Sequence, residues 1–396
     1  MAASLPGVPR LTLRTRLGFA LGALALLLAG LVGLGVRAYD GNVSALLHLY
    51  RPAVEPFEVP PGLVLYEDGG YDGMKVWLVA RGLPRLLGVG VEGGGPLFAE
   101  TYRYQRVLLP ALGLLVAGGD EDRLPAALLA INVAAVLATL ALFVLATGRW
   151  SLHALALATN PAALIGVVYV LTEPLAILCT TAFLVDWRRR GERVSTLATI
   201  LLALALLARE TTLFVTLPLA VLLASRRQWR DVALTLASTL PFAAWSAFLA
   251  FRFAEVPLEG SSRMVNLPLS GSLALLADLA NGVTVYGLSA LAFLVLVALP
   301  VLVFTASRVL REGAGAGALT VMLASLVGLL FCLDAHIWSV LTAVGRVVPS
   351  LYPVFAFAAL DKDGPLERAA SAGMILVGVV GAVGVALVAH PFTISR

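Results

Sequence analysis

Residues 124–146 read LPAALLAINVAAVLATLALFVLA, and this stretch decides the class of fold. It contains no charged side chain and only two strongly polar ones, Asn132 and Thr139. A helix of about 20 apolar residues is enough to cross the roughly 30 Å of hydrocarbon in a bilayer. The stretch therefore predicts a transmembrane helix.

Ten further apolar runs give eleven candidate spans, so we expect an all-α, polytopic membrane helix bundle. The runs are 17–36, 124–146, 151–170, 172–187, 195–208, 211–225, 231–252, 283–306, 315–333, 340–360 and 369–389. Of all residues, 60% are hydrophobic and 13% are charged, whereas soluble domains have about 45–50% and about 25%. These fractions exclude a soluble enzyme, a disordered chain and a nucleic-acid-binding protein.

The basic residues indicate how the bundle is oriented. With eleven spans and a cytoplasmic N-terminus, the short inner segments, among them WRRRGER at 187–193, hold more than half of the 28 basic residues. Segment 37–123 is expected on the outer side, because it has only eight basic residues against eleven acidic ones. This is the positive-inside pattern, and it predicts a multi-pass protein of the cell membrane.

The run VLLPALGLLVA at 107–117 is too short to span a bilayer alone, and it contains Pro110. If it were a full span, every later loop would be inverted and the basic segment 187–193 would face outward. We therefore expect an interfacial half-helix within a large first outer loop, 37–123. The whole chain, 1–396, is expected to form one integral-membrane domain.

Ionisable side chains fall at the outer ends of several predicted spans. Such a group within hydrocarbon costs at least about 2.5–3.5 kcal/mol on insertion scales, which makes it a candidate for function. Arg346 lies inside its span and requires an anionic partner, for which we favour a phosphate. Each of the others also has a structural explanation. Glu173 would complement the dipole at the start of a helix, and Arg209 and Glu210 would cap helix ends in the headgroup zone. His336 would belong to an aromatic belt at the membrane interface. The candidates are Glu173, Arg209, Glu210, Asp334, His336 and Arg346, with Asp278 as a further one.

The outer loop contains the sequence GYDG at 70–73. It precedes MKVWLVARGLPRLLGV (74–89), whose apolar face and basic residues predict an amphipathic interfacial helix. Asp72 is then placed at the start of this helix, above the membrane surface, and we predict that it is the catalytic carboxylate, with Tyr71 beside it. The alternative is a turn that only caps the helix. A second YDG, at 39–41, makes Asp40 the reserve candidate.

The run TYRYQRVLLPAL at 101–112 brings Arg103, Gln105 and Arg106 to the start of the predicted half-helix. Arginines at this position suit a phosphate, and anchoring to lipid headgroups is the alternative. The sequence contains no Walker, HExxH or GxSxG motif. No cofactor is predicted, and participation of a divalent metal is left open.

Five motifs occur in a fixed order, namely GYDG (70–73), RYQRVLLPAL (103–112), LPAALLAINVAA (124–135), TEPLA (172–176) and LARETTLF (207–214). Together they resemble a family of bacterial and archaeal polytopic proteins linked to cell-surface glycopolymer formation. That family is similar to the GT-C class of integral-membrane glycosyltransferases. The resemblance covers about residues 15–260. Relatives commonly continue YDG with a glutamine and aromatic residues, where this chain has Met74-Lys75-Val76-Trp77.

The resemblance implies a hexosyl- or pentosyltransferase. The donor would be a polyprenyl-phosphate-linked sugar, and the acceptor would be an extracytoplasmic glycan, lipid or protein. Asp72 would accept the proton of the acceptor hydroxyl, and the arginines would bind the donor phosphate. The implied phosphate ligands are Arg209, Arg346, Arg103 and Arg106, and the other site candidates are Tyr71, Gln105, Glu173, Glu210 and His336.

Two other functions are compatible with a bundle that contains charges. A polytopic transporter or a flippase of lipid-linked sugars is expected to show internal repeats and a site near the midplane. The charges here gather at one outer depth instead, and transport does not explain the large outer loop. A non-catalytic assembly scaffold would leave Asp72, Arg209 and Arg346 without a purpose.

Overall fold

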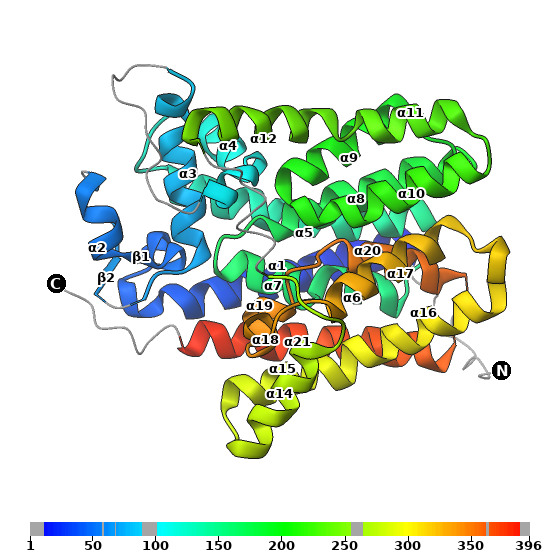
Figure 1. Cartoon of the computed structure of the whole chain (residues 1–396). Coiled ribbons are helices and arrows are strands. Elements are labelled where there is room, and N and C mark those ends of the chain that lie inside the picture. Colours follow the sequence, from blue (N-terminus) through cyan, green and yellow to red (C-terminus); the bar gives the residue numbers. More distant parts are fainter. Residues whose placement is uncertain are drawn as a thin grey trace.

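The structure, a computed structural model, describes residues 12–57, 59–67, 69–88, 101–254, 264–361 and 364–388. Helices dominate these ranges. The only strands within them are β1 (Leu49–Tyr50) and β2 (Leu65–Tyr66), which pair in parallel with Leu49 opposite Leu65. The long helices run side by side, and α2, α3, β1 and β2 gather at one end of the bundle (Figure 1). The fold class is all-α, as expected.

Five helices are long and apolar enough to cross a membrane, by length and composition. They are Leu13–Tyr39, Leu124–Thr147, Trp229–Phe253, Val285–Glu312 and Pro365–Leu387. Five further apolar helical stretches have 10–17 residues, namely Leu152–Val168, Thr196–Ala208, Glu210–Ser225, Ala318–Phe331 and Leu351–Leu360, and the first of them is divided at Asn160. The chain is therefore a helical membrane protein.

The first part of the chain forms one long helix and then a series of short elements. Helix α1 (Leu13–Val36) begins after Thr12, whose hydroxyl accepts a hydrogen bond from the amide of Thr15 at 3.2 Å. Helices α3 and α4 occupy the positions of the predicted amphipathic helix and half-helix. The elements after α1 are η1 (Arg37–Tyr39), η2 (Val43–Leu47), β1, α2 (Arg51–Val54), η3 (Glu55–Phe57), β2, α3 (Asp72–Leu86), η4 (Thr101–Gln105) and α4 (Leu108–Val116).

The middle of the chain consists of helices that repeatedly cross the length of the bundle. The stretch 124–146 of the sequence forms α5, with a left-handed Gly148 at its end. The elements are α5 (Leu124–Thr147), α6 (Leu152–Thr159), α7 (Pro161–Val168), α8 (Glu173–Arg189), α9 (Thr196–Ala208), η5 (Glu210–Thr212), α10 (Leu213–Ser225), α11 (Trp229–Ala237) and α12 (Leu240–Phe253).

The last third of the chain completes the bundle. A π-helical segment, η6, joins α15 to α16 without interrupting the helix. The elements are α14 (Ser270–Asn281), α15 (Val285–Phe293), η6 (Leu294–Ala298), α16 (Leu299–Glu312), η7 (Gly313–Gly315), α17 (Ala318–Phe331), α18 (Ala335–Trp338), α19 (Leu341–Val344), α20 (Leu351–Leu360) and α21 (Pro365–Val388).

Two runs that the sequence predicts as continuous helices are broken. The run 151–170 divides into α6 and α7 at Asn160–Pro161, because proline lacks the amide that would continue the first helix. Asn160 caps α7 by accepting a hydrogen bond from the amide of Ala163 at 3.0 Å. The run 340–360 divides into α19 and α20, and the intervening loop contains Arg346. Both predictions of an unbroken helix are therefore wrong.

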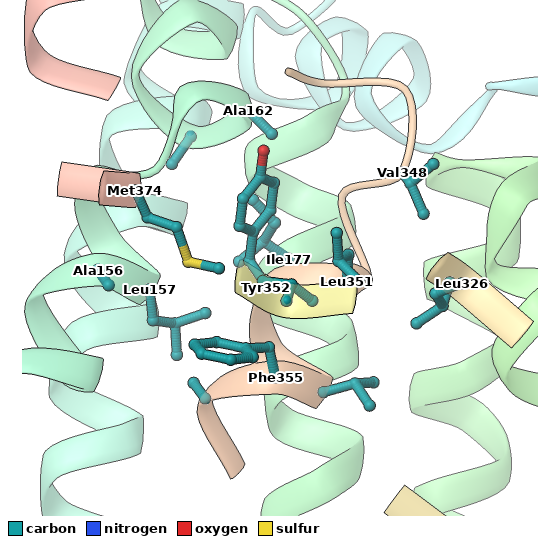
Figure 2. Close-up of a cluster of buried hydrophobic side chains, with 14 of the residues drawn as sticks. Ala156, Leu157, Ala162, Ile177, Leu326, Val348, Leu351, Tyr352, Phe355 and Met374 are labelled. Atoms are coloured by element: carbon teal, nitrogen blue, oxygen red, sulfur yellow. The ribbon is translucent and has the colours of Figure 1, made fainter. Parts of the chain in front are cut away.

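A continuous hydrophobic core joins α6, α7, α8, α17, α20 and α21. Figure 2 shows part of it, where Tyr352 and Phe355 of α20 lie among Leu157, Ile177 and Met374. The hydroxyl of Tyr352 donates a hydrogen bond to the carbonyl oxygen of Gly345, so the one polar atom of this buried ring has a partner. This contact also fixes the start of the loop that carries Arg346.

Some predicted segments lie partly outside the described residues. These are residues 58, 68 and 89–100 of the predicted outer loop 37–123, residue 89 at the end of the predicted amphipathic helix, and residue 389 at the end of the predicted span 369–389.

Candidate functional site

Side chains from six parts of the chain line one pocket where helices α8 and α9 meet the short elements. The pocket has a volume of about 320 Å³, which includes the space at its open mouth. Of the seven ionisable residues that form its ion pairs, three come from segment 37–123 and four come from the helices that follow it. The lining residues are Asp72, Lys75, Val76, Val79, Arg103, Arg106, Pro110, Leu171, Thr172, Glu173, Arg209 and Arg346.

Asp72 is held by two arginines that lie far from it in the sequence. Arg103 Nη1 donates a hydrogen bond to Asp72 Oδ1, and Arg346 Nη2 donates one to Asp72 Oδ2. Burial alone would raise the pKa of Asp72, but the positive charges of Arg346 and Arg103 outweigh it and hold that pKa well below its usual value. The Asp72 carboxylate is therefore ionised and fully engaged.

Glu173 is the most deeply buried charge of the pocket, with 0% of its side chain exposed. Its Oε1 atom accepts a hydrogen bond from Arg346 Nη1 at 2.9 Å and forms an ion pair with Arg209 Nη1, also at 2.9 Å. Arg346 also donates from Nε to the carbonyl oxygen of Thr342. One guanidinium group thus connects Asp72 of α3 to Glu173 of α8.

Glu210 and Arg106 form the third ionic contact. Arg106 donates from Nε to Glu210 Oε2 at 2.9 Å and from Nη2 to Glu210 Oε1 at 2.6 Å. This two-pronged geometry is the strong form of an arginine–carboxylate pair. Burial would lower the pKa of Arg106, but the charge of Glu210 dominates and raises it above its usual value.

The pocket is rich in ionisable side chains. Among the described residues, Lys75 and four arginines line it together with Asp72 and Glu173, and Glu210 pairs with Arg106 beside it. Within the described part of the chain, Arg209 Nε is buried without a hydrogen-bond partner, and so is Glu173 Oε2. The unpartnered Nε atom of Arg209 favours a hydrogen-bond acceptor in the pocket.

Close packing of backbones explains the glycine of the GYDG motif. A Cβ atom on Gly73 would lie 2.3 Å from the carbonyl oxygen of Tyr169 and 3.2 Å from the Cα atom of Leu47. Glycine therefore lets the first turn of α3 pack directly against the loop between α7 and α8. This packing places Asp72 against Glu173's ion pairs.

The loop between α7 and α8 is itself held under strain. Val170 has a φ of 54°, which is rare for a β-branched residue. Asn132 of α5 donates hydrogen bonds from Nδ2 to the carbonyl oxygens of Gly166 at 3.2 Å and of Leu171 at 2.8 Å. These bonds span the strained residue, so Asn132 stabilises the loop that presents Tyr169 and Glu173.

Aromatic rings pack behind Asp72. The ring of Tyr71 lies 4.0 Å from that of Tyr169, between centroids, and 5.5 Å from the guanidinium carbon of Arg346. The Tyr71 hydroxyl donates to the carbonyl oxygen of Thr342 at 3.2 Å. His48 stacks on Tyr66 with a centroid separation of 4.8 Å, and burial lowers its pKa to about 4. His48 is therefore neutral at pH 7 and adds no charge to the site.

The structure brings together Asp72, Arg103, Arg106, Glu173, Arg209, Glu210 and Arg346, with Tyr71 in contact. The other predicted site residues do not line the pocket. Asp40 is exposed in a left-handed turn after η1, and Asp278 is exposed on α14. Gln105 is buried and contacts Ser246 of α12 at 3.3 Å. His336 is exposed, and Asp334 accepts a hydrogen bond from its amide at 2.9 Å to cap α18.

Sequence reasoning did not predict Lys75, Tyr169 or Asn132 as parts of the site. A signal for Lys75 was available, because Asp72, Lys75, Val76 and Val79 follow the i, i+3, i+4, i+7 pattern of one helix face. That face lines the pocket. Tyr169 and Asn132 act through the backbone of a strained loop, for which a single sequence offers no signal.

Among the described residues, no group of three or more histidine, cysteine, aspartate or glutamate side chains is placed to hold a metal ion. The carboxylates of the pocket contact arginines instead.

No protein-family model, curated protein or solved structure matches the chain.

We predict that Gly73→Ala lowers the free energy of unfolding by about 1–3 kcal/mol, because the added methyl group overpacks the contact with Tyr169. Unfolding in detergent micelles measures this. The matched control is Gly22→Ala on α1, where nothing lies within 4 Å and alanine is expected to be neutral or stabilising. If Gly73→Ala is as stable as Gly22→Ala, the close packing of α3 on the loop does not exist in the protein.

Proposed function

We propose that the protein is a membrane glycosyltransferase that transfers a sugar from a polyprenyl-phosphate-linked donor to an extracytoplasmic acceptor. The resemblance to the glycopolymer-formation family and to the GT-C class motivates the proposal. The pocket supports it independently, because the carboxylate of Asp72 on α3 lines the same pocket as four arginines. That shared pocket is the observation that carries the proposal.

The proposed reaction forms a bond between the acceptor oxygen and the anomeric carbon of the sugar. The bond between that carbon and the phosphate oxygen breaks, and its electron pair leaves with the polyprenyl phosphate. Arginines around the phosphate stabilise this developing negative charge. Asp72 accepts the proton that the acceptor hydroxyl loses. An oxocarbenium-like transition state makes the anomeric carbon reactive, as it does in glycoside hydrolysis.

The ion pairs of Asp72 suggest how it becomes a base. In the structure Arg103 and Arg346 hold its pKa low, and a carboxylate with a low pKa is a weak base. A donor phosphate offers the same arginines a second anion. As they turn toward the phosphate, their hold on Asp72 weakens and its pKa rises. Under this proposal, Asp72 gains basicity only when the donor is bound.

We further propose an eleven-span topology with a cytoplasmic N-terminus and an outward-facing segment 37–123. The distribution of basic residues supports it. The site then lies at the outer membrane surface, where the lipid tail of the donor reaches the bundle from the bilayer. Helices α3 and α4 lie along this surface rather than across the membrane.

We expect Asp72→Asn to reduce transfer by about 10²–10⁴-fold, because the amide keeps the size of the side chain but does not accept a proton. The purified protein is incubated with a panel of polyprenyl-monophosphate hexoses and pentoses plus host membrane extract, and release of polyprenyl phosphate is measured. Asp40→Asn, at the exposed YDG, is the matched control and is expected to keep the parent rate.

Three results would contradict this assignment. If Asp72→Asn releases polyprenyl phosphate at the parent rate, Asp72 is not the base. If only Asp40→Asn loses this release, Asp40 is the base. Movement of intact donor across vesicle membranes, without any release of polyprenyl phosphate, would favour a flippase instead.

The topology is tested with single cysteines at two exposed glutamates, Glu55 and Glu192, in a chain whose Cys179 and Cys332 are replaced by alanine. An impermeant maleimide added to intact cells should label position 55 and leave position 192 unlabelled until the cells are opened. The reverse pattern would invert the proposed orientation. Because both positions replace the same residue type, their intrinsic reactivity with the reagent is comparable.

A further inference from the structure

A second pocket lies between the last turns of α5, α8 and α20. Its volume is about 680 Å³, including the space at its mouth. Helix α8 contains Glu173 of the first site at its beginning and Arg188 and Arg189 of this pocket at its end. Its 17 residues rise about 1.5 Å each, so the two pockets are about 25 Å apart along the helix. That separation is close to the thickness of the hydrocarbon core.

The floor of this pocket is ionic and already balanced. Arg188 Nη2 donates to both carboxylate oxygens of Asp361, at 2.9 Å and 3.0 Å. The guanidinium carbon of Arg188 lies 5.9 Å from the ring centroid of Phe357, and Arg308 Nη1 lies 3.9 Å from Asp361 Oδ2. Among the residues that the structure describes, Asp361 is the only carboxylate that lines the pocket, and two arginines contact it.

The rim of the pocket is cationic. Arg149, just after α5, and Arg189, at the end of α8, are both exposed and line the mouth. Within the described part of the chain, neither guanidinium group makes an ion pair or a hydrogen bond. Apolar side chains, among them Val185 and Leu360, form the walls next to this charged rim. A ligand that fits therefore combines an anionic head with an apolar body.

We propose that this pocket binds a phosphate ester, the headgroup of an anionic membrane lipid, at the end of the bundle opposite the first site. Arg149 and Arg189 hold the phosphate oxygens, and the apolar wall contacts the glycerol and the first methylene groups. Basic pockets between membrane helices bind lipid headgroups in this manner. The proposal is independent of the glycosyltransferase proposal, since it uses none of the same side chains.

A general surface attraction is the competing explanation, and the chain offers a matched control for it. Arg227, in the connection between α10 and α11, and Arg230, in the first turn of α11, are both exposed. They lie at the same end of the bundle, because α10 runs away from Glu210 of the first site. They do not line the pocket. Their replacement removes the same charge from the same end.

The test is a titration of the detergent-solubilised protein with dioctanoyl-phosphatidylglycerol, followed by native mass spectrometry. We expect dioctanoyl-phosphatidylglycerol to bind to the protein at least about tenfold more tightly than dioctanoyl-phosphatidylcholine. The double variant Arg149→Gln/Arg189→Gln should lose this preference, whereas Arg227→Gln/Arg230→Gln should keep it. Each single variant, Arg149→Gln and Arg189→Gln, should weaken binding of dioctanoyl-phosphatidylglycerol severalfold. If the double variant unfolds at a lower temperature than the parent protein, the single variants are compared instead.

Glycerol 3-phosphate distinguishes the source of the phosphate ester. If millimolar glycerol 3-phosphate displaces the lipid only partly, the natural ligand is the lipid, and if it binds as tightly as the lipid, the site takes a soluble phosphate ester. Both outcomes support a phosphate-ester site. Equal losses in the pocket and control variants, or no preference for phosphatidylglycerol over phosphatidylcholine, would overturn the proposal.

Discussion

The candidate site depends on the hydrogen bonds that Arg346 donates. Its guanidinium group donates to Asp72 on α3 and to Glu173 at the start of α8, while Nε donates to the carbonyl oxygen of Thr342. An arginine is suited to this position because its donors form a rigid planar fork that serves several acceptors at once. Without it, Glu173 would keep only the ion pair with Arg209, and Asp72 only that with Arg103.

The same contact relates the architecture to the proposed chemistry. A carboxylate in an apolar bundle is stable only when it is paired, so the ion pairs that stabilise Asp72 and Glu173 also gather the arginines in one place. A phosphate that enters the pocket competes with Asp72 for these arginines. Stability of the free protein and activation of the proposed base therefore draw on the same guanidinium groups.

Much of the bundle could be predicted from the sequence, because long apolar runs and the charges within them stand out. Arg209, Glu210 and Arg346 were recognisable as candidates since each interrupts or ends such a run. Which carboxylate each arginine contacts depends on tertiary packing and was not predictable. The breaks at Asn160 and before α20 were missed although Asn160–Pro161 and Pro349 are signals that end a helix, because the interpretation relied on the overall apolar character of each run.

The two YDG sequences show the limit of local pattern most clearly. Around Asp40 the backbone turns into the left-handed region, and the side chain stays exposed. Around Asp72 the following glycine packs against the backbone of Tyr169, and the carboxylate reaches two arginines. The motif is the same, and only the long-range packing separates the two sites. Asn132 belongs to the same category, because its importance lies in a loop that is distant in sequence.

The central claim is that the arginines around Asp72 and Glu173 bind a lipid-linked phosphate. Binding of farnesyl phosphate tests this claim without knowledge of the sugar, and farnesol is the uncharged control. The measurement uses the Arg149→Gln/Arg189→Gln variant, so that the second pocket does not contribute. We expect farnesyl phosphate to bind and farnesol not to bind. Arg209→Lys and Arg346→Lys should each weaken binding about ten- to hundredfold, because lysine does not reproduce the guanidinium fork. Arg230→Lys should leave the affinity unchanged. Equal affinity for farnesol and farnesyl phosphate, or unchanged affinity for farnesyl phosphate in both Arg209→Lys and Arg346→Lys, would contradict the account.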